Sequence, residues 1–358
     1  MPASCNMRVD QHRLLGLNVD GQCAMGKGIE RVAGSSEPVI ERRAGRSYWF
    51  RLLLGVGISA LFVYFLAHKL DWRLFRGALA RVEVTYLLLA LLFLSLDYGL
   101  RLLRWHWMLR AVSSPVSLRG CARPFFIGFA LNNLLPLRAG DLARAIAFRQ
   151  RLGAPVSAVL GTLVVERLLD LLVVLLILGV ALALVAPRGA GLADIQTVGW
   201  VALLCAGLAV AAIIILVLLS RSRWRLHPVL QKSGLGRLGE ALSLFASPVR
   251  LAPLLCLSLA AWLLEVAVFA SVAWSLGLPA SGSWSAMGAG TLGTLLPGSP
   301  GHLGTFDFFA MNGMMIHGVE RNLALAYAVV VHVVLWLPLT ALGVLLLLLP
   351  TEGSADGR

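Results

Sequence analysis

Residues 168–186 read LLDLLVVLLILGVALALVA, and residues 201–219 read VALLCAGLAVAAIIILVLL. Asp170 is the one charged residue in these two runs. A helix needs ~20 predominantly apolar residues to cross ~30 Å of hydrocarbon. Neither run alternates with the period of two that strands of a membrane barrel show. The two runs therefore predict a helical protein that crosses a membrane.

The composition of the whole chain agrees with an all-α integral membrane protein. Apolar residues make up 58% of the 358 residues, charged residues 14%, and the mean hydropathy is +0.82. Soluble domains carry roughly a quarter charged residues. The net charge of +13 would suggest nucleic acid in a soluble protein, but here the charge lies between apolar runs. It indicates arginine-rich loops that face anionic lipid, and we expect no nucleic-acid partner.

Six apolar segments are long enough to cross the membrane, at 48–68, 84–103, 157–186, 198–219, 251–276 and 323–349. The segment 157–186 would be roughly 45 Å long as a straight helix, so it must tilt, protrude or break. Two further apolar segments, 124–136 and 284–297, are too short to cross. Both end in Leu-Leu-Pro, and we predict that both are re-entrant.

Loop charge predicts the orientation and the domain limits. Arg42, Arg43 and Arg46 precede the first span and place the N-terminus in the cytoplasm. The arginine-rich stretches 101–123, 138–151 and 221–250 fall on that same side, and the sparsely charged loop 187–197 falls outside. The basic loop 69–83 also falls outside, which favours an amphipathic interfacial stretch. We expect a disordered cytoplasmic tail at 1–47, with Met25 as an alternative start, a membrane domain at 48–349 and a short cytoplasmic tail at 350–358.

An internal repeat is the next feature of the chain. A shift of 161 residues aligns Leu134-Leu135-Pro136 with Leu295-Leu296-Pro297 and Gly140 with Gly301. In our topology the two Leu-Leu-Pro segments enter from opposite sides, which is the pattern of an inverted repeat. Such repeats place a site near the midplane, where exposed helix N-termini suit an anionic group. Because Leu and Pro are common here, chance matching is the alternative.

The first polar motif surrounds the first Leu-Leu-Pro. Pro136 cannot continue a helix without losing a hydrogen bond, Gly140 permits a turn, and Asp141 could cap the helix that follows. Arg138 and Arg144 flank that helix start and could hold a lipid phosphate. The neighbouring Asn132 and Asn133 complete the motif. The alternative is an ordinary cytoplasmic loop whose arginines follow the positive-inside rule.

The second motif places Glu166, Arg167 and Asp170 inside a long apolar run, where they also mark a possible break. Each charge costs ~2.5–3.5 kcal/mol at the membrane centre on insertion scales. Glu166 and Asp170 share one helical face, and Arg167 can pair with Asp170. These charges can satisfy one another or Arg138 and Arg144. The motif is either a buried ion network that fixes packing or a site for substrate or a coupling ion.

The third motif follows the second Leu-Leu-Pro and rules out a continuous helix. Its members are Pro297, Gly298, Ser299, Pro300, Gly301, His302, Gly304, Thr305 and Asp307. His302 titrates near neutrality and could relay a proton, whereas the alternative is an external loop.

Four polar residues stand alone in apolar sequence, namely Asp97, Arg104, Glu265 and His332. The shift of 161 places Glu265 on Arg104, which predicts a pair of opposite charges across the repeat. His332 follows the second broken segment much as Arg167 follows the first. A packing role is the alternative for this histidine.

The three motifs together resemble the lysylphosphatidylglycerol synthase transmembrane family of flippase-like proteins, over roughly residues 50–349. The shared pattern is P-x-R-x-G-[ED]-x-x-R, then E-R-x-x-D, then P-x-x-P-G-x-x-G-x-x-[ED]. Asp141 and Asp307 stand where the family usually has Glu, and His332 stands where it often has Arg. The resemblance implies that the protein moves or exposes a lipid. Fused members flip aminoacylated phosphatidylglycerol made by a cytoplasmic transferase domain, which we do not expect here.

The leading hypothesis is therefore a flippase-like protein of the bacterial cytoplasmic membrane that translocates a phospholipid or a lipid-linked glycan or isoprenoid. Arg138, Arg144 and Arg167 would bind the headgroup phosphate. Asp141, Glu166 and Asp170 would hold those arginines or engage a cationic headgroup. One alternative is an accessory subunit that presents lipid to a partner glycosyltransferase or aminoacyl transferase. Another is an intramembrane enzyme, but soluble catalytic motifs are absent from the sequence, and we expect neither cofactor nor metal.

Overall fold

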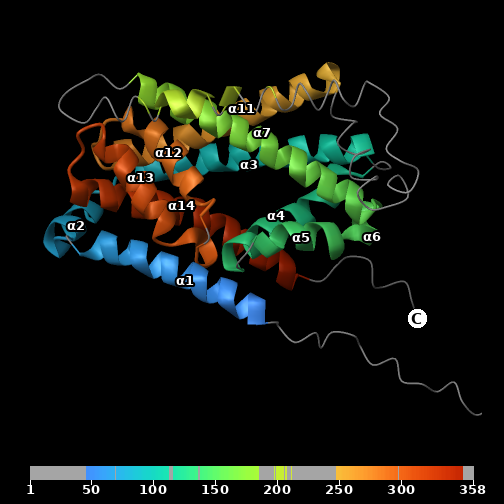
Figure 1. The fold of residues 1–358 in the computed structure, drawn as a ribbon, viewed down its shortest axis with the longest axis horizontal. Coiled ribbons are helices and arrows are strands. Elements are labelled where there is room, and N and C mark those ends of the chain that lie inside the picture. The colour runs from blue at the N-terminus through green and yellow to red at the C-terminus, as the bar shows by residue number, and fades with distance from the viewer. Residues whose placement is uncertain are drawn as a thin grey trace, which may run out of the picture. The chain divides into compact units, whose positions relative to one another are not determined.

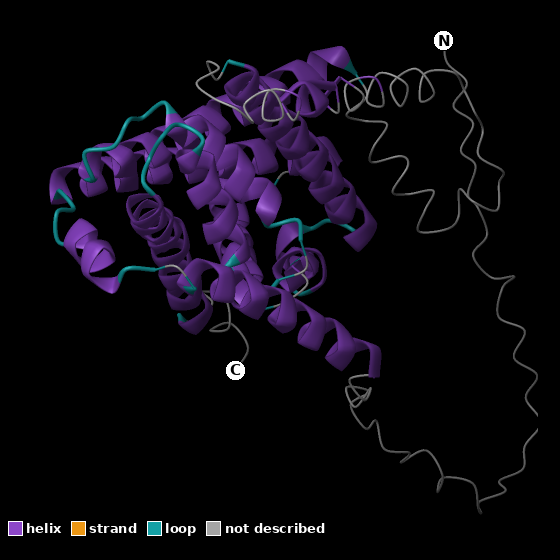
Figure 2. Ribbon diagram, turned by 60° about the vertical axis from the view of Figure 1, so that its left-hand side comes forward, coloured by secondary structure: helices purple, strands orange, loops and turns teal. Residues whose placement is uncertain are grey.

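The computed structural model describes residues 46–68, 70–112, 116–135, 138–184, 197, 199–204, 206–207, 211, 247–296 and 298–349. Within these residues every regular element is a helix (Figure 2). Several predictions lie outside the described residues. They concern the two tails, nearly all of the loop 187–197, most of the span 198–219 and of the loop 221–250, and Pro136 and Pro297.

Five long helices correspond to five of the predicted spans. They are α1 (Arg46–Ala67), α3 (Val84–Val112), α7 (Val156–Ala183), α11 (Pro248–Ser275) and α14 (Arg321–Leu348). Helices α3, α11 and α14 are long and apolar enough to cross a membrane. Helix α7 equals them in length but carries three charges near its middle. The protein is an all-α membrane bundle, as the apolar runs predicted.

Helix α7 runs without interruption through Glu166, Arg167 and Asp170, although their charges suggested a possible break. The helix continues because neighbouring helices satisfy these side chains. Glu166 lies 3.5 Å from Arg144, and Asp170 lies 2.7 Å from Arg104. Ion pairs inside the bundle thus replace the water that a break would have supplied.

Two helical hairpins occupy the positions of the predicted re-entrant segments. The first joins α4 (Leu118–Leu134) to α5 (Ala139–Ile146), which the short α6 (Arg149–Leu152) follows. The second joins α12 (Gly282–Gly293) through η2 (Pro300–His302) to α13 (Thr305–Met315). The arms of each hairpin run antiparallel, since Gly128 faces Arg144 in the first and Gly282 faces Met314 in the second. The chain therefore turns back after each Leu-Leu-Pro, as a re-entrant segment requires.

Glycine lets the hairpin arms touch. A Cβ on Gly140 would lie 1.9 Å from the carbonyl oxygen of Gly128, and one on Gly313 would lie 2.5 Å from the Cα of Ala286. Both distances are far below van der Waals contact, so only glycine fits these positions. Close backbone contact of this kind is how helices pack in a membrane, where lipid is as apolar as leucine.

The helices repeat in order and in packing. The series α3, α4, α5, α7 is followed by α11, α12, α13, α14, and α4 packs on α14 as α12 packs on α7. Helices α3 and α11 pack side by side and antiparallel, since Tyr86 meets Trp274 and Arg104 meets Ser258 (Figure 1). Antiparallel contact between equivalent helices is what a two-fold axis in the membrane plane produces. The arrangement matches the predicted inverted repeat.

The remaining helices stand outside the repeat. Helix α1 packs on α13 through the aromatic contact of Phe62 with Phe308, whose ring centroids are 5.0 Å apart. The eight-residue α2 (Trp72–Leu79) occupies the basic loop for which an amphipathic stretch was predicted. Asp71 caps it by accepting hydrogen bonds from the backbone of Arg73 and Leu74.

Helix α3 is longer than the predicted span, and its length changes which arginines belong to the cytoplasmic loop. The predicted span ended at residue 103, whereas the helix continues to Val112. The stretch counted as cytoplasmic began at Arg101, but Arg101 is buried inside the bundle. Arg104 is buried as well, in agreement with its other assignment as a polar residue within apolar sequence. Their aliphatic stems and ion pairs let the helix extend past the apolar run. They therefore contribute to the interior rather than to the positive-inside pattern.

Candidate functional site: a polar cavity between the two halves

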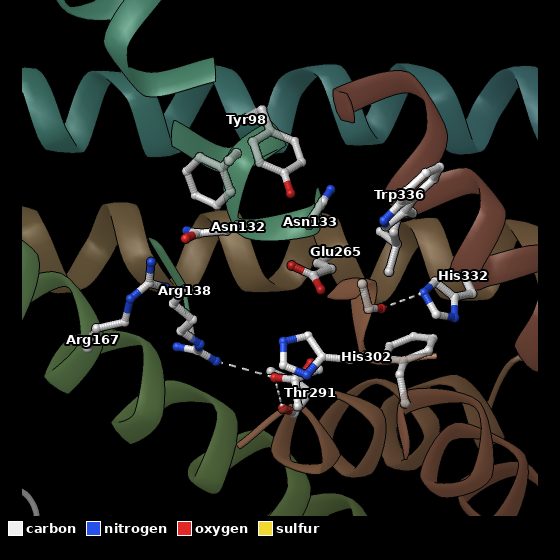
Figure 3. A pocket seen from close by; sticks show the side chains of 15 residues that line it. Tyr98, Asn132, Asn133, Arg138, Arg167, Glu265, Thr291, His302, His332 and Trp336 are labelled. Atoms are coloured by element: carbon white, nitrogen blue, oxygen red, sulfur yellow. Dashed lines mark hydrogen bonds between the residues drawn. The ribbon is translucent and has the colours of Figure 1, made fainter. Parts of the chain in front are cut away.

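Two adjoining cavities of about 190 and 300 Å³ lie where the two hairpins meet. Both are lined by Tyr98, Phe129, Arg138, Arg167, Glu265, Thr291 and Thr294. The linkers of the hairpins approach each other here, since Arg138 Nη2 donates to Thr294 Oγ1 at 3.4 Å (Figure 3). A polar space at the interface of inverted repeats is the place where such folds bind their substrates.

The linkers hold their residues in uncommon backbone conformations. Arg138 and His302 have φ angles of 52° and 56°, a region that residues other than glycine rarely adopt. Gly301, with a φ of 71°, sits so close beneath Trp336 that a Cβ would lie 2.8 Å from Nε1 of the indole ring. Both strained side chains line the cavity. Strain of this kind persists where the surrounding structure fixes the residue and is typical of binding sites.

In the first half, Asp141 pairs with Arg167. The Arg167 Nη2 donates to both carboxylate oxygens of Asp141, at 3.1 and 3.0 Å. Asn132 binds Asp141 twice: its amide Nδ2 donates to the carboxylate at 2.9 Å, and its Oδ1 accepts from the backbone N–H of Asp141 at 3.1 Å. Helix α5 begins at Ala139, one turn earlier than the sequence suggested, so Asp141 is its third residue and not its cap.

In the second half, Asp307 pairs with His332 in the equivalent place. Asp307 is the third residue of α13, as Asp141 is of α5, and His332 is the twelfth residue of α14, as Arg167 is of α7. His332 Nδ1 lies 2.8 Å from Asp307 Oδ1, and Nε2 lies 3.0 Å from the carbonyl oxygen of Gly301. His332 and Arg167 therefore occupy equivalent positions, and each contacts the aspartate of its own half.

A third ion network joins α3, α7 and α11 beneath the cavity. Arg101 binds Asp97 at 2.8 Å and Glu265 at 2.5 Å, while Arg104 binds Asp170 at 2.7 Å. The shift of 161 had pointed to Arg104 as the partner of Glu265, and that pairing is wrong by one helical turn. Two residues that the repeat makes equivalent contact each other only where they lie close to the two-fold axis.

Among the arginines that line the cavities, Arg138 has no carboxylate of the described residues within 4 Å. In the part of the chain that the structure describes, Arg101, Arg104, Arg144 and Arg167 each form an ion pair within 4 Å, whereas Arg138 is hydrogen-bonded only to Thr294. Its guanidinium points into the cavity from the linker (Figure 3). The site therefore presents one guanidinium that no carboxylate of the described residues contacts within 4 Å.

Arg144, which the sequence grouped with Arg138, lies away from the cavity. Its side chain is fully buried, with the guanidinium 4.1 Å from the ring centroid of Trp105 and 3.5 Å from Glu166. Glu166 is itself 2% exposed. The pair joins α5 to α7 and fixes the first hairpin, so of the alternatives weighed for these charges the geometry favours a packing role.

The predicted residues thus fall into three groups. Those that line the cavities are Asn132, Asn133, Arg138, Arg167, Asp170, Glu265, Gly301, His302 and His332. Those that support the cavity from behind or from the linkers are Arg104, Gly140, Asp141, Arg144, Glu166, Ser299, Pro300, Gly304 and Asp307. Pro136 and Pro297 are not described.

Several lining residues escaped the sequence reasoning, namely Tyr98, Arg101, Phe129, Trp262, Thr291, Thr294 and Trp336. Aromatic residues are common in apolar runs, so nothing in the pattern separates these from packing residues. The signal that could have found the threonines is their position, because Thr291 and Thr294 lie just before the second Leu-Leu-Pro.

An apolar groove of about 440 Å³ adjoins the polar cavity. It lies between α7, α12 and α13, and its lining includes Leu178, Leu182, Leu292, Leu296, Phe309 and Ile316. Leu292 lines both this groove and the larger polar cavity. A polar chamber that continues into an apolar groove has the amphipathic character of a lipid molecule.

Comparison with known proteins agrees with this geometry. A search of curated proteins gives no match to the chain. The family model described as the lysylphosphatidylglycerol synthase TM region matches residues 52–343. This range begins in α1, contains both hairpins and both carboxylate pairs, and ends in α14. The chain belongs to the family of the lysylphosphatidylglycerol synthase TM region, a family of membrane proteins associated with lipid handling.

Proposed function

We propose that the protein translocates a phosphate-bearing lipid between the leaflets of the bacterial cytoplasmic membrane, with its N-terminus in the cytoplasm. The observation that carries the proposal is the unpaired guanidinium of Arg138 in a polar cavity between two inverted halves. An uncompensated cation inside a membrane protein is costly and marks a binding site by default. A lipid phosphate is the anion most abundant in its surroundings.

The cavity offers a phosphate more than one contact. The guanidinium of Arg138 is planar and can bind two phosphate oxygens at once. The Arg167 side chain is 34% exposed, and its buried Nε has no hydrogen-bond partner among the described residues. The hydroxyl groups of Thr291 and Thr294 line the same wall. Two arginines and the hydroxyl of Thr291 form a binding set for a phosphodiester. The Thr294 hydroxyl donates to the carbonyl oxygen of Thr291 at 2.7 Å and accepts from Arg138.

Carboxylates that line the cavities bear on the rest of the headgroup. Glu265 lines both cavities, and Asp170 lines the larger one. Both are already bound to arginines of α3. A headgroup with an amine or with sugar hydroxyls would find acceptors here. The substrate class that fits is a phospholipid or a phosphate-linked glycan or isoprenoid lipid, with its chains in the groove beside Leu292.

Translocation requires that the cavity open to each side in turn. In an inverted repeat, the two halves present equivalent elements to opposite sides, so a small rearrangement of one half reproduces the state of the other. Here the elements that meet at the cavity are the two hairpin linkers, which Arg138 and Thr294 connect. Separation of the first linker would open one side, and separation of the second linker would open the other.

The test is lipid exchange in proteoliposomes. The purified protein is reconstituted with a small fraction of headgroup-labelled phospholipid, and dithionite reports the label that reaches the outer leaflet. We expect exchange above that of empty liposomes, and a loss of roughly 10- to 150-fold in Arg138→Ala, since hydrogen bonds to a charged group contribute about 1.5–3 kcal/mol. The matched control is Arg73→Ala, because Arg73 is an exposed arginine of α2.

Two results would contradict the proposal. Exchange equal to that of empty liposomes for every phosphate-bearing lipid tested would rule out translocation by this protein alone. If the lipid nevertheless binds in an Arg138-dependent way, measured by lipid that co-purifies with the wild type and not with the variant, the protein presents lipid to a partner enzyme instead. Equal exchange by wild type and Arg138→Ala would remove the cavity from the path.

A further inference from the structure

The second hairpin contains a histidine whose two contacts are both hydrogen bonds only when an additional proton is bound. His332 Nδ1 lies 2.8 Å from Asp307 Oδ1, and His332 Nε2 lies 3.0 Å from the carbonyl oxygen of Gly301 (Figure 3 shows the latter bond). A carbonyl oxygen only accepts, so Nε2 must carry a proton. An ionised carboxylate also only accepts, so a second proton must lie between Nδ1 and Asp307. The pair therefore carries one proton more than neutral histidine with ionised aspartate.

The bound proton controls a contact with the linker. Without it, neutral His332 has one N–H for two acceptors, so a ring lone pair must face either Asp307 or Gly301. The bond from Nε2 to Gly301 ties α14 to the middle of the linker, and Asp307 Oδ2 accepts from the backbone N–H of Gly304 at 2.9 Å. The ionised carboxylate of Asp307 is the stronger acceptor and keeps the remaining N–H, so the Nε2 lone pair then faces the carbonyl oxygen of Gly301. Loss of one proton thus replaces the linker contact by a repulsion.

The first hairpin provides a built-in comparison. There Arg167 takes the place of His332 and binds Asp141 with a permanent charge. The two hairpins are alike in fold, yet the second is clasped by a histidine where the first is clasped by an arginine, which keeps its proton. If the two linkers close opposite sides of the cavity, proton occupancy favours closure of one side over the other.

Other ionisable groups face the same cavity and have to be considered. They are His302 from η2, Asp307 from α13, Arg138 from the first linker, Arg167 from α7, Glu265 from α11 and Tyr98 from α3. The parts of α4 that line the cavity contribute the amides of Asn132 and Asn133. His302 is the other histidine of this set. Its buried Nδ1 has no hydrogen-bond partner among the described residues.

We infer that the His332–Asp307 pair is a proton-binding site that couples lipid movement to a proton gradient across the membrane. The inference rests on the proposed function and supplies its energy source. One proton enters the pair from the aqueous phase while the second linker is clasped, and the same proton leaves when the linker opens. The headgroup site formed by Arg138 and the proton site formed by His332 lie on opposite walls of one cavity, so occupancy of one can influence the other.

The first experiment follows the linker itself. Backbone hydrogen exchange is measured by mass spectrometry on the full-length protein in nanodiscs between pH 5.5 and 8.5, and corrected for the intrinsic pH dependence of exchange. Opening of residues 298–308 should increase with pH by up to roughly tenfold per unit, as expected for one linked proton. Opening of residues 132–144 in the first hairpin should stay constant.

Variants separate this site from its neighbours. Asp307→Asn supplies an amide that donates to Nδ1 and accepts from Gly304, which leaves the Nε2 proton for Gly301, so linker opening should no longer depend on pH. His302→Gln should retain the pH dependence of the linker, and so should His317→Gln, a histidine near the α13–α14 turn that contacts Ser285. A pH-independent linker in the wild type, or an unchanged pH response in Asp307→Asn, would overturn the proton site.

The second experiment measures coupling. In proteoliposomes, an imposed pH gradient should shift the steady-state distribution of labelled lipid between the leaflets, and a protonophore should abolish the shift. In Asp307→Asn the distribution should be the same with and without the gradient. Lipid exchange that ignores the gradient in the wild type refutes coupling and leaves the proposed function intact. A pH-dependent linker without any lipid exchange refutes the proposed function and supports the proton site.

Discussion

Arg138 and Arg144 are six residues apart in the same motif, and the structure predicts opposite consequences when each is replaced by alanine. The Arg144 side chain is fully buried, 3.5 Å from Glu166, and over the ring of Trp105. Its removal leaves the carboxylate of Glu166 buried with Arg167, 3.7 Å away, as its remaining ion-pair partner among the described residues. Breaking a buried pair costs about 3–5 kcal/mol, and the Arg167 contact favours the lower end of that range.

Replacement of Arg138 should cost much less stability. Arg138 donates one hydrogen bond to a described residue, and this bond reaches the neutral hydroxyl oxygen of Thr294 over 3.4 Å. A bond of that kind contributes at most about 1 kcal/mol to stability. Its φ of 52° adds strain of about 1–2 kcal/mol, which alanine would share and glycine would relieve. Arg138→Ala should therefore fold as well as the wild type, and Arg138→Gly should be slightly more stable.

The assay compares folding and exchange for each variant. Thermal unfolding in detergent is followed by the fluorescence of the tryptophans, and lipid exchange is normalised to the amount of folded protein. We expect a large drop in the unfolding temperature of Arg144→Ala, with exchange per folded molecule close to that of the wild type. For Arg138→Ala we expect an unchanged unfolding temperature and a loss of exchange of at least tenfold.

The opposite pattern would refute this reasoning. If Arg144→Ala unfolds within about 1 kcal/mol of the wild type and loses exchange as Arg138→Ala does, then Arg144 contacts the substrate in another conformation. The distinction drawn from burial would then fail. Arg144→Lys serves as a further check, because lysine keeps the charge but cannot reproduce the planar stacking on Trp105.

Three further predictions follow from the same contacts. Gly140→Ala should separate α4 from α5 and lower the unfolding temperature, because its Cβ would lie 1.9 Å from the Gly128 carbonyl oxygen, whereas Gly99→Ala, with open space around it, should not; equal unfolding temperatures would contradict the close packing. Ala289→Trp should fill the apolar groove and reduce lipid exchange severalfold without loss of folding, and unchanged exchange would exclude the groove from the lipid path. Asp170→Asn should cost about 3–5 kcal/mol, since it leaves Arg104 buried without a carboxylate. Trp262→Phe removes one hydrogen bond to Asp170 and should cost about 1 kcal/mol. If chemical denaturation shows that Trp262→Phe loses more stability than Asp170→Asn, the result argues against this network.

The fold could be predicted from the sequence where it depends on the length of the apolar segments. Five of the six segments of 20 or more apolar residues became long helices, and the two segments that ended in Leu-Leu-Pro became hairpins. Most of the sixth segment, 198–219, lies outside the described residues. The end of α3 was not accessible, because Arg101 and Arg104 look like the start of a cytoplasmic loop. What keeps them in the helix is a set of carboxylates on α3, α7 and α11, and such partners are known only once the helices are packed.

The repeat shows how far a sequence shift can go. A shift of 161 residues correctly placed equivalent elements, but it placed Glu265 on Arg104, and these two do not pair. Under a two-fold axis, a residue touches its own equivalent only where it lies close to that axis. Trp262, which the same shift places on Arg101, meets that condition, since the guanidinium of Arg101 lies 4.3 Å from the centroid of its ring. The shift therefore identifies equivalent positions, and the distance from the axis decides which of them touch.

The same limit explains why the polar motifs could not be divided into binding and packing residues beforehand. Arg138, Arg144 and Arg167 share a residue type, and each has an acidic residue close by in the sequence. What separates them is which carboxylates reach them: Arg144 has Glu166, Arg167 has Asp141, and Arg138 has none among the described residues. In a membrane interior, a paired arginine is neutralised by the protein, whereas an unpaired one needs an anion from elsewhere. The missing partner of Arg138 is therefore the feature that points to a ligand.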